Sequence, residues 1–157
     1  MYVDFLATER HYREHIHDVW LGLPEGVAGN LYNDTVERGD RPVVVASWKD
    51  ALTARRKGRP IILMEHGAGQ TYEGINHPSY TGASERDGVM LYLAPSERCA
   101  ERHRAVRPDI PVEVVGCPKL DHYLATDFPQ ASNVAVAHHW SCAVTTETMS
   151  AWPHFHA

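Results

Sequence analysis

The chain has 157 residues, of which 43% are hydrophobic and 22% are charged, and its formal net charge is −5 at neutral pH. This length suits one ordinary domain, or one domain and the start of another. The mild negative charge disfavours nucleic acids and anionic membranes as partners, and no apolar stretch approaches the roughly 20 residues that a membrane span needs.

The compartment is indicated by the first residues and by the cysteines. The amino terminus lacks the basic region and the apolar region of a secretory signal. Three cysteines are widely spaced and form no CxxC pattern, which is typical of free thiols in a reducing environment. We therefore expect a cytoplasmic protein without a membrane span.

The first part of the chain predicts a strand over residues 2–6 and then a helix with Thr8 as its N-cap. An apolar stripe marks the core-facing side of that helix, at Tyr12, Ile16, Val19 and Trp20. Residues 23–26 end the helix in a turn. The segment 30–35 is ambiguous between a strand and a loop.

The middle of the chain alternates strands and helices. The β-branched run at residues 43–46 predicts a strand, and Ser47 opens a helix that reaches about residue 57. Gly58 follows as a C-cap. The short apolar run at residues 61–64 predicts a buried strand of a parallel sheet.

The next segment, residues 67–88, is rich in glycine and has no periodic apolar face, which is typical of a functional loop. Residues 89–94 predict another buried strand, and Ser96 caps the helix that follows. Cys99, His103 and Val106 share one face of that helix. Residues 110–115 predict a further strand, which leads into a short helix ending near residue 126.

Strands that alternate with helices predict an α/β fold, with a Rossmann-like, mostly parallel sheet flanked by helices. We expect a first domain over residues 1–126, a linker over 127–132 and the start of a second domain over 133–157. Right-handed crossovers bring the loops after residues 64, 94 and 115 to one edge of the sheet.

The strand at 61–64 ends at Glu65 and His66, at the edge where open α/β sheets hold their ligands. An imidazole with an ordinary pKa of about 6.5 suits proton transfer near neutral pH. The alternative is a histidine that caps the turn and bonds a backbone carbonyl. Neighbouring strand residues point to opposite faces, which disfavours a joint catalytic role for Glu65.

Two other kinds of site are disfavoured. Gly67 and Gly69 form a G-x-G, but Tyr72 stands where a dinucleotide fingerprint needs its third glycine. The eleven histidines include His11 and His15 at helical spacing, yet neither a zincin order nor a third ligand accompanies them. We expect neither a metal nor a cofactor.

With these landmarks placed, the chain resembles the amino-terminal domain of GT-B-fold transferases, and it looks closest to the CDP-glycerol glycerophosphotransferase and related glycosyltransferase group. The resemblance covers roughly residues 40–141. The residues that carry it are His66-Gly67 after a strand, Ala94-Pro95-Ser96 opening a helix, and the turn at residues 115–121, Val-Gly-Cys-Pro-Lys-Leu-Asp. UDP-N-acetylglucosamine 2-epimerases share this architecture and a comparable glycine-proline turn.

The resemblance implies that His66 is the general base that deprotonates an acceptor hydroxyl during attack on a nucleotide-activated sugar or glycerol donor. It also implies a group of substrate-binding residues, which are Gly67, Gln70, Ser96, Lys119, Asp121 and His138. For Lys119 and Asp121 the alternative is a surface turn in which the aspartate caps the next helix.

The family's donor-binding domain is almost absent from the sequence, which suggests a truncated product, a homo-oligomer or a partner chain that supplies the donor domain. Two further readings stay open. One is an epimerase-like sugar-nucleotide enzyme, and the other is a non-catalytic α/β binding module.

Overall fold

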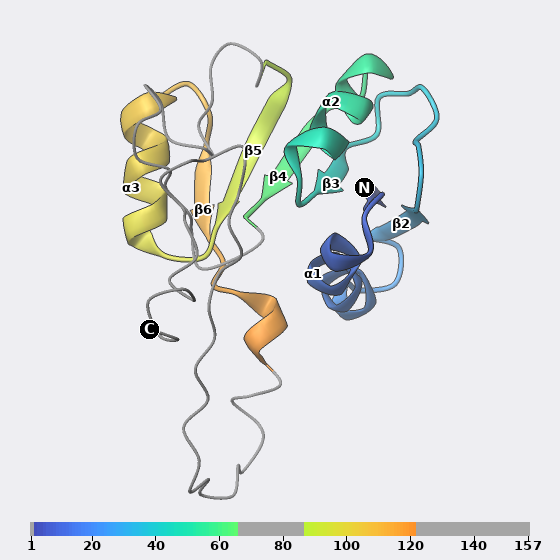
Figure 1. Cartoon of the computed structure of the whole chain (residues 1–157), viewed down its shortest axis with the longest axis horizontal. Helices are drawn as coiled ribbons and strands as arrows, with labels where there is room; N and C mark the ends of the chain where they lie inside the picture. The colour runs from blue at the N-terminus through green and yellow to red at the C-terminus, as the bar shows by residue number, and fades with distance from the viewer. Residues whose placement is uncertain (1, 66–86, 122–157) are drawn as a thin grey trace, which may run out of the picture.

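The computed structural model describes residues 2–65 and 87–121, which form a six-stranded sheet with helices on both faces (Figure 1). All neighbouring strands are parallel, in the order β2-β1-β3-β4-β5-β6. The predicted Rossmann-like α/β class is therefore confirmed. The strands are β1 (Val3–Leu6), β2 (Ala28–Tyr32), β3 (Val43–Val45), β4 (Ile61–Met64), β5 (Val89–Ala94) and β6 (Val112–Val114). The helices are α1 (Arg10–Gly22), α2 (Trp48–Arg56), α3 (Glu97–Val106) and the 3-10 turn η2 (Pro118–Leu120).

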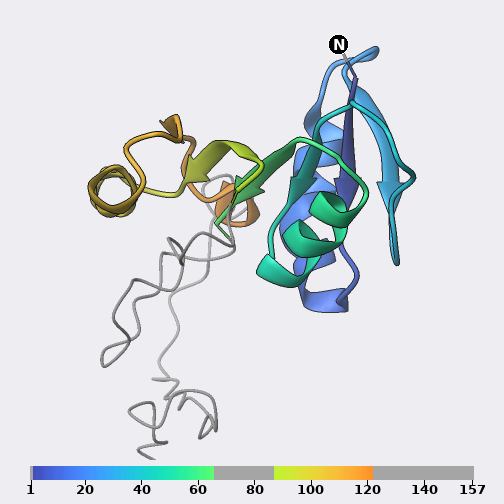
Figure 2. The same ribbon diagram turned by 90° about the horizontal axis from the view of Figure 1, so that it is seen from above.

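Among the described elements, α1 covers one face of the twisted sheet, and α2 and α3 cover the other (Figure 2). Alternate strand residues point to opposite faces, so each face has its own apolar core. Ile16 of α1 packs with Phe5, Val44 and Met64 on one face. On the other face α2 and α3 pack against a core that includes Leu6, Val43, Val45, Ile61, Leu63, Tyr92, Ala51, Ala54 and Ala100.

The predicted stripe of α1 is confirmed, because Tyr12, Val19 and Trp20 pack around the buried Ile16. The predicted N-cap is wrong. The helix begins after Glu9, and that residue's side chain makes no capping hydrogen bond.

The caps of the other two helices are confirmed. The Ser47 hydroxyl oxygen accepts a hydrogen bond from the Asp50 N–H at 3.1 Å, and Ser96 does the same for the Cys99 N–H at 3.4 Å. After α2, Gly58 has a φ of +72°, a left-handed conformation that glycine adopts without steric cost. β6 is shorter than the strand predicted over residues 110–115, although Ile110 is buried in the core.

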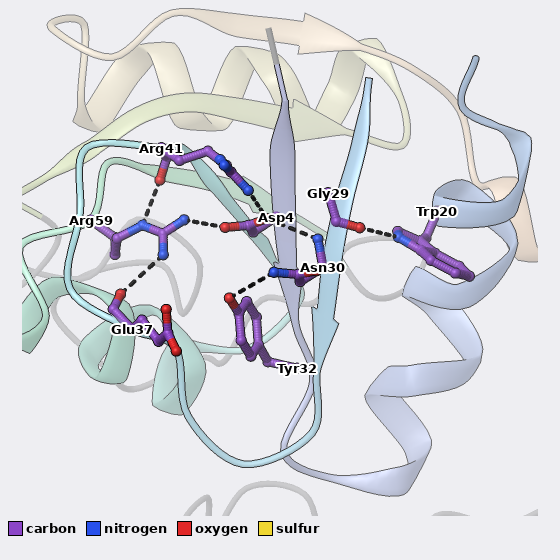
Figure 3. Close-up of polar contacts among 8 residues, drawn as sticks. All are labelled: Asp4, Trp20, Gly29, Asn30, Tyr32, Glu37, Arg41 and Arg59. Carbon is purple, nitrogen blue, oxygen red and sulfur yellow. Dashed lines mark hydrogen bonds and ion pairs between the residues drawn. The ribbon is translucent and has the colours of Figure 1, made fainter. Parts of the chain in front are cut away.

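A buried ion pair lies near the amino ends of β1 and β4 (Figure 3). The Arg59 guanidinium donates to Asp4 Oδ2 at 2.6 Å, and both side chains are only 3% exposed. Arg59 also donates to the carbonyls of Arg41 at 2.6 Å and Glu37 at 3.0 Å. Because these two carbonyls belong to the connection between β2 and β3, Arg59 holds that connection against the sheet.

The other Asp4 oxygen stabilises an irregularity in β2. Val3 pairs with Ala28, but Phe5 pairs with Leu31, so β2 has one extra residue. The Asn30 N–H donates to Asp4 Oδ1 at 2.9 Å. This bulge is thus held by a side chain of the neighbouring strand.

Gly29, also in the bulge, has its carbonyl bonded by the Trp20 indole N–H at 2.9 Å (Figure 3). A Cβ at residue 29 would stand 2.2 Å from Asp4 Oδ1, which is closer than real Cβ contacts allow. Trp20 therefore does more than pack in the core, and residue 29 must be glycine for the carboxylate to keep its place.

The expected linker at 127–132 and the expected second domain at 133–157 lie outside the described residues. In the part of the chain that is described, no helix combines the length and the apolar character needed to cross a membrane.

Candidate functional site

The carboxyl ends of β4, β5 and β6 lie side by side at one edge of the sheet (Figure 1). Glu65, Pro95 and Val115 follow these ends directly. The predicted convergence of three chain segments at this edge is confirmed, because the strands are parallel neighbours. Ligands of open α/β sheets are held at such an edge, which makes it the candidate site.

Glu65 is a charged residue of this edge that is held by both a backbone and a side-chain hydrogen bond. Its N–H donates to the Leu93 carbonyl at 3.1 Å and so extends the β4–β5 ladder by one bond. Its carboxylate Oε2 accepts a hydrogen bond from the Tyr92 hydroxyl at 2.5 Å. Tyr92 is 1% exposed and Glu65 is half-buried. The carboxylate is therefore held from the α3 side of the sheet by a side chain of the core.

A second β-bulge gives Tyr92 this direction. Ile61 pairs with Val89, but Ile62 pairs with Leu91, so Met90 is an extra residue in β5. An extra residue reverses the side-chain alternation beyond it. Val89 and Tyr92 consequently share the core on the α3 face, although they are three residues apart. No sequence signal reveals this bulge, so the contact between Tyr92 and Glu65 could not be predicted.

Two side chains of α3 lie next to Tyr92. The His103 ring lies against the Tyr92 ring at an interplanar angle of 32°, with 3.3 Å between the centroids, and both His103 and Cys99 are 3% exposed. Burial raises the pKa of the Cys99 thiol, and the negative charge of Glu65 raises this pKa further. A hydrogen bond with Tyr92 lowers the pKa, but by less than burial and Glu65 raise it. The thiol is therefore held in its neutral form, which is the unreactive form.

Ser96 lies at the carboxyl end of β5, as expected. Its hydroxyl oxygen caps α3 by accepting from the Cys99 N–H. The same serine therefore fixes the start of α3, the helix that carries Cys99 and His103. A substrate contact by Ser96 stays a prediction.

The turn after β6 contains Gly116, which has a φ of +78° and leads into η2. The backbone of Lys119 lies in η2, and Asp121 follows it as an exposed residue. η2 contacts α1, on the face of the sheet opposite α3. Lys119 and Asp121 are therefore positioned by η2, and their contacts with a substrate stay predictions.

The remaining predicted site residues, His66, Gly67, Gln70 and His138, lie outside the described residues. The structure does describe Glu65, the residue directly before His66. Glu65 is fixed by its backbone bond to Leu93 and by its side-chain bond to Tyr92.

A further carboxylate at the same edge was not anticipated from the sequence. Asp50 is fully buried, and it accepts hydrogen bonds from the Thr8 hydroxyl at 2.7 Å and from the Thr8 N–H at 3.3 Å. Thr8 follows β1 and Asp50 follows β3, so this contact joins the two strands between which the chain order reverses. The Ser47-x-x-Asp50 spacing matches a capping box and points to Asp50, but it does not reveal Thr8 as the partner of its carboxylate.

The position of this contact bears on where a ligand can bind. In open α/β sheets the usual ligand crevice lies where the strand order reverses. Here Thr8 and Asp50 bridge that point, and beside them Lys49 forms an ion pair with Glu9 at 2.6 Å. This arrangement favours the ends of β4 and β5 over the ends of β1 and β3 as the ligand site.

Within residues 2–65 and 87–121 no group of three or more His, Cys, Asp or Glu side chains is arranged to hold a metal ion.

The strand order and the helices on both faces define a doubly wound, Rossmann-like α/β domain. No protein-family model, curated protein or solved structure matches this chain significantly.

Proposed function

We propose that this chain is the acceptor-side domain of a GT-B-type transferase, which transfers a sugar or a glycerophosphate from a nucleotide-activated donor to an acceptor hydroxyl. The observation that carries the proposal is the fixed position of Glu65. It directly follows the central strand β4 at the carboxyl edge of the sheet and directly precedes His66. The contact between Thr8 and Asp50 at the point of strand reversal supports the same location.

In the proposed reaction, His66 takes the proton of the acceptor hydroxyl while the acceptor oxygen bonds to the donor. With a sugar donor, that bond forms at the anomeric carbon, and a nucleoside diphosphate leaves. With CDP-glycerol, it forms at the phosphorus that carries the glycerol, and CMP leaves. Positioned proton removal of this kind accelerates a reaction by about 10²–10⁴-fold. The proposal requires neither a metal nor a cofactor.

The experiment that tests this proposal measures nucleotide release. The full chain is incubated with CDP-glycerol or with a UDP-sugar, and with glycerol as the hydroxyl acceptor. We expect CMP or UDP to form, and we expect His66→Ala to reduce the rate by about 10²–10⁴-fold. The matched control is His17→Ala, because the His17 side chain is 51% exposed on α1. It should leave the rate unchanged.

The two alternatives predict different outcomes. Interconversion of a UDP-sugar with its epimer, without net release of UDP, would favour the epimerase-like reading. Calorimetric binding of these nucleotides without any turnover would leave a binding module. Equal rates in the His66→Ala and His17→Ala variants would overturn the general-base assignment.

A further inference from the structure

The hydrogen bond between Tyr92 and Glu65 joins a fully buried ring to a carboxylate that still reaches solvent. Tyr92 is 1% exposed, whereas Glu65 is half-buried at the end of β4. The 2.5 Å separation between the Tyr92 hydroxyl and Glu65 Oε2 is at the short end for a hydroxyl donating to a carboxylate. The carboxylate is thus oriented from inside the protein and accessible from outside.

The bulge in β5 affects two side chains, Met90 and Tyr92. It leaves Met90 48% exposed, which is unfavourable for an apolar side chain. It also turns the Tyr92 hydroxyl toward Glu65, which regular alternation would not do. Bulges are frequent next to functional sites, where they redirect a side chain. The exposed methionine and the buried tyrosine are therefore two results of one local insertion.

α3 keeps the tyrosine in this position. The His103 ring lies against the Tyr92 ring, tilted by 32° and with 3.3 Å between the centroids, and Cys99 is buried in the same core. A ring packed in this way loses little further freedom when a ligand arrives. A carboxylate held by such a ring is preorganised, and preorganisation lowers the cost of binding.

We propose that Glu65 binds a hydroxyl of a polyol or sugar, and that Tyr92 is the positioning residue that holds the Glu65 carboxylate for this contact. An ionised carboxylate accepts hydrogen bonds only, so it selects ligands that donate. The inference rests on the proposed function in one respect, which is that the hydroxyl acceptor occupies the carboxyl edge of β4 and β5.

The experiment titrates the ¹⁵N-labelled full chain with glycerol and with propane-1,2-diol, which has one hydroxyl fewer. The backbone amides of Glu65 and Ser96 report binding. We expect Glu65→Gln to weaken glycerol binding by about tenfold to a hundredfold, because a charge-assisted hydrogen bond is lost. Glu113→Gln is the matched control, since Glu113 is exposed on β6. It should bind as the wild type does.

The positioning role of Tyr92 is tested by a double-mutant cycle. Tyr92→Phe keeps the ring but removes the hydroxyl, and we expect it to weaken glycerol binding by about three- to tenfold. In the Glu65→Gln background the same change should have no further effect, because Tyr92 acts through the carboxylate. Tyr32→Phe controls for the loss of a phenol, since the Tyr32 hydroxyl bonds the Asn30 side chain, away from Glu65.

Each outcome decides between the claims. This inference is overturned if Glu65→Gln binds glycerol with wild-type affinity, or if glycerol changes no amide signal of the wild type. Either result holds whatever the nucleotide-release assay gives. Additive losses in the double variant overturn the positioning role. Glycerol binding that depends on Glu65, in a chain that releases no nucleotide, supports this inference while contradicting the transferase proposal.

Discussion

The ion pair between Asp4 and Arg59 gives the sharpest test of the fold. Asp4→Asn keeps the shape of the side chain but removes the charge opposite a guanidinium that is 3% exposed. Removing one partner of a buried pair costs about 3–5 kcal/mol, because the other charge stays buried without compensation. Arg59 keeps its bonds to the carbonyls of Arg41 and Glu37. We therefore expect a loss near the lower limit, about 3 kcal/mol.

Urea unfolding followed by far-UV circular dichroism measures this loss. With a slope of about 2 kcal/mol per molar urea, the midpoint should fall by about 1.5 M at pH 7. Arg59→Met removes the charge together with the bonds to the Arg41 and Glu37 carbonyls. The double variant with Asp4→Asn should therefore lose less stability than the sum of the two single losses, because the two groups form one pair. Glu97→Gln, in the exposed pair with Arg104, should stay close to the wild type. A midpoint for Asp4→Asn within roughly 0.2 M of the wild type would refute the reasoning.

Three further predictions concern single groups. Gly29→Ala should destabilise by about 1–3 kcal/mol in the same urea assay, because its Cβ would lie 2.2 Å from Asp4 Oδ1; wild-type stability would contradict this contact. Burial raises the pKa of Asp4, but hydrogen bonds from Arg59, Asn30 and Arg41 outweigh it, and the pKa lies below 3.8. Its contribution to stability is therefore present above pH 3.8 and is lost as the pH falls through the folded pKa, and acid unfolding of Asp4→Asn should lack this loss. In a Cys117→Ser/Cys142→Ser background, thiolate absorbance should show that Glu65→Gln lowers the pKa of Cys99 and that Tyr92→Phe raises it. Shifts of the same sign would contradict the arrangement.

The elements could be predicted because their causes are local. Short apolar runs that end at turn residues gave five of the strands within a few residues of their observed bounds, and Ser47 and Ser96 marked the starts of α2 and α3. The parallel order followed from the alternation of strands and helices. β2 stayed ambiguous, because its bulge breaks the alternation that identifies a strand.

The errors concern contacts between residues far apart in the sequence. Thr8 has the side chain of an N-cap, but its hydroxyl donates to Asp50, 42 residues away, and the helix begins one residue later. Tyr92 was missed because the direction of its side chain depends on an extra residue opposite β4. Hydrogen bonds of this kind have no local pattern, so only the assembled sheet reveals them. The candidate site could be predicted as an edge, but not as a particular pair of side chains.

The distance along the chain between Asp4 and Arg59 also has a consequence for biosynthesis. The two residues are 55 positions apart, and ribosomes add about 5–20 residues per second. For about 3–11 s after Asp4 is made, its principal counter-ion does not exist. Arg41, which also pairs with Asp4, is made earlier, but its side chain is 45% exposed. A carboxylate is costly to bury without a buried partner, so we expect β1 to be held only weakly in the sheet during this interval. We therefore expect the first stable intermediate on the ribosome to include β4 as well as the three strands that precede it, so that it contains four strands rather than three.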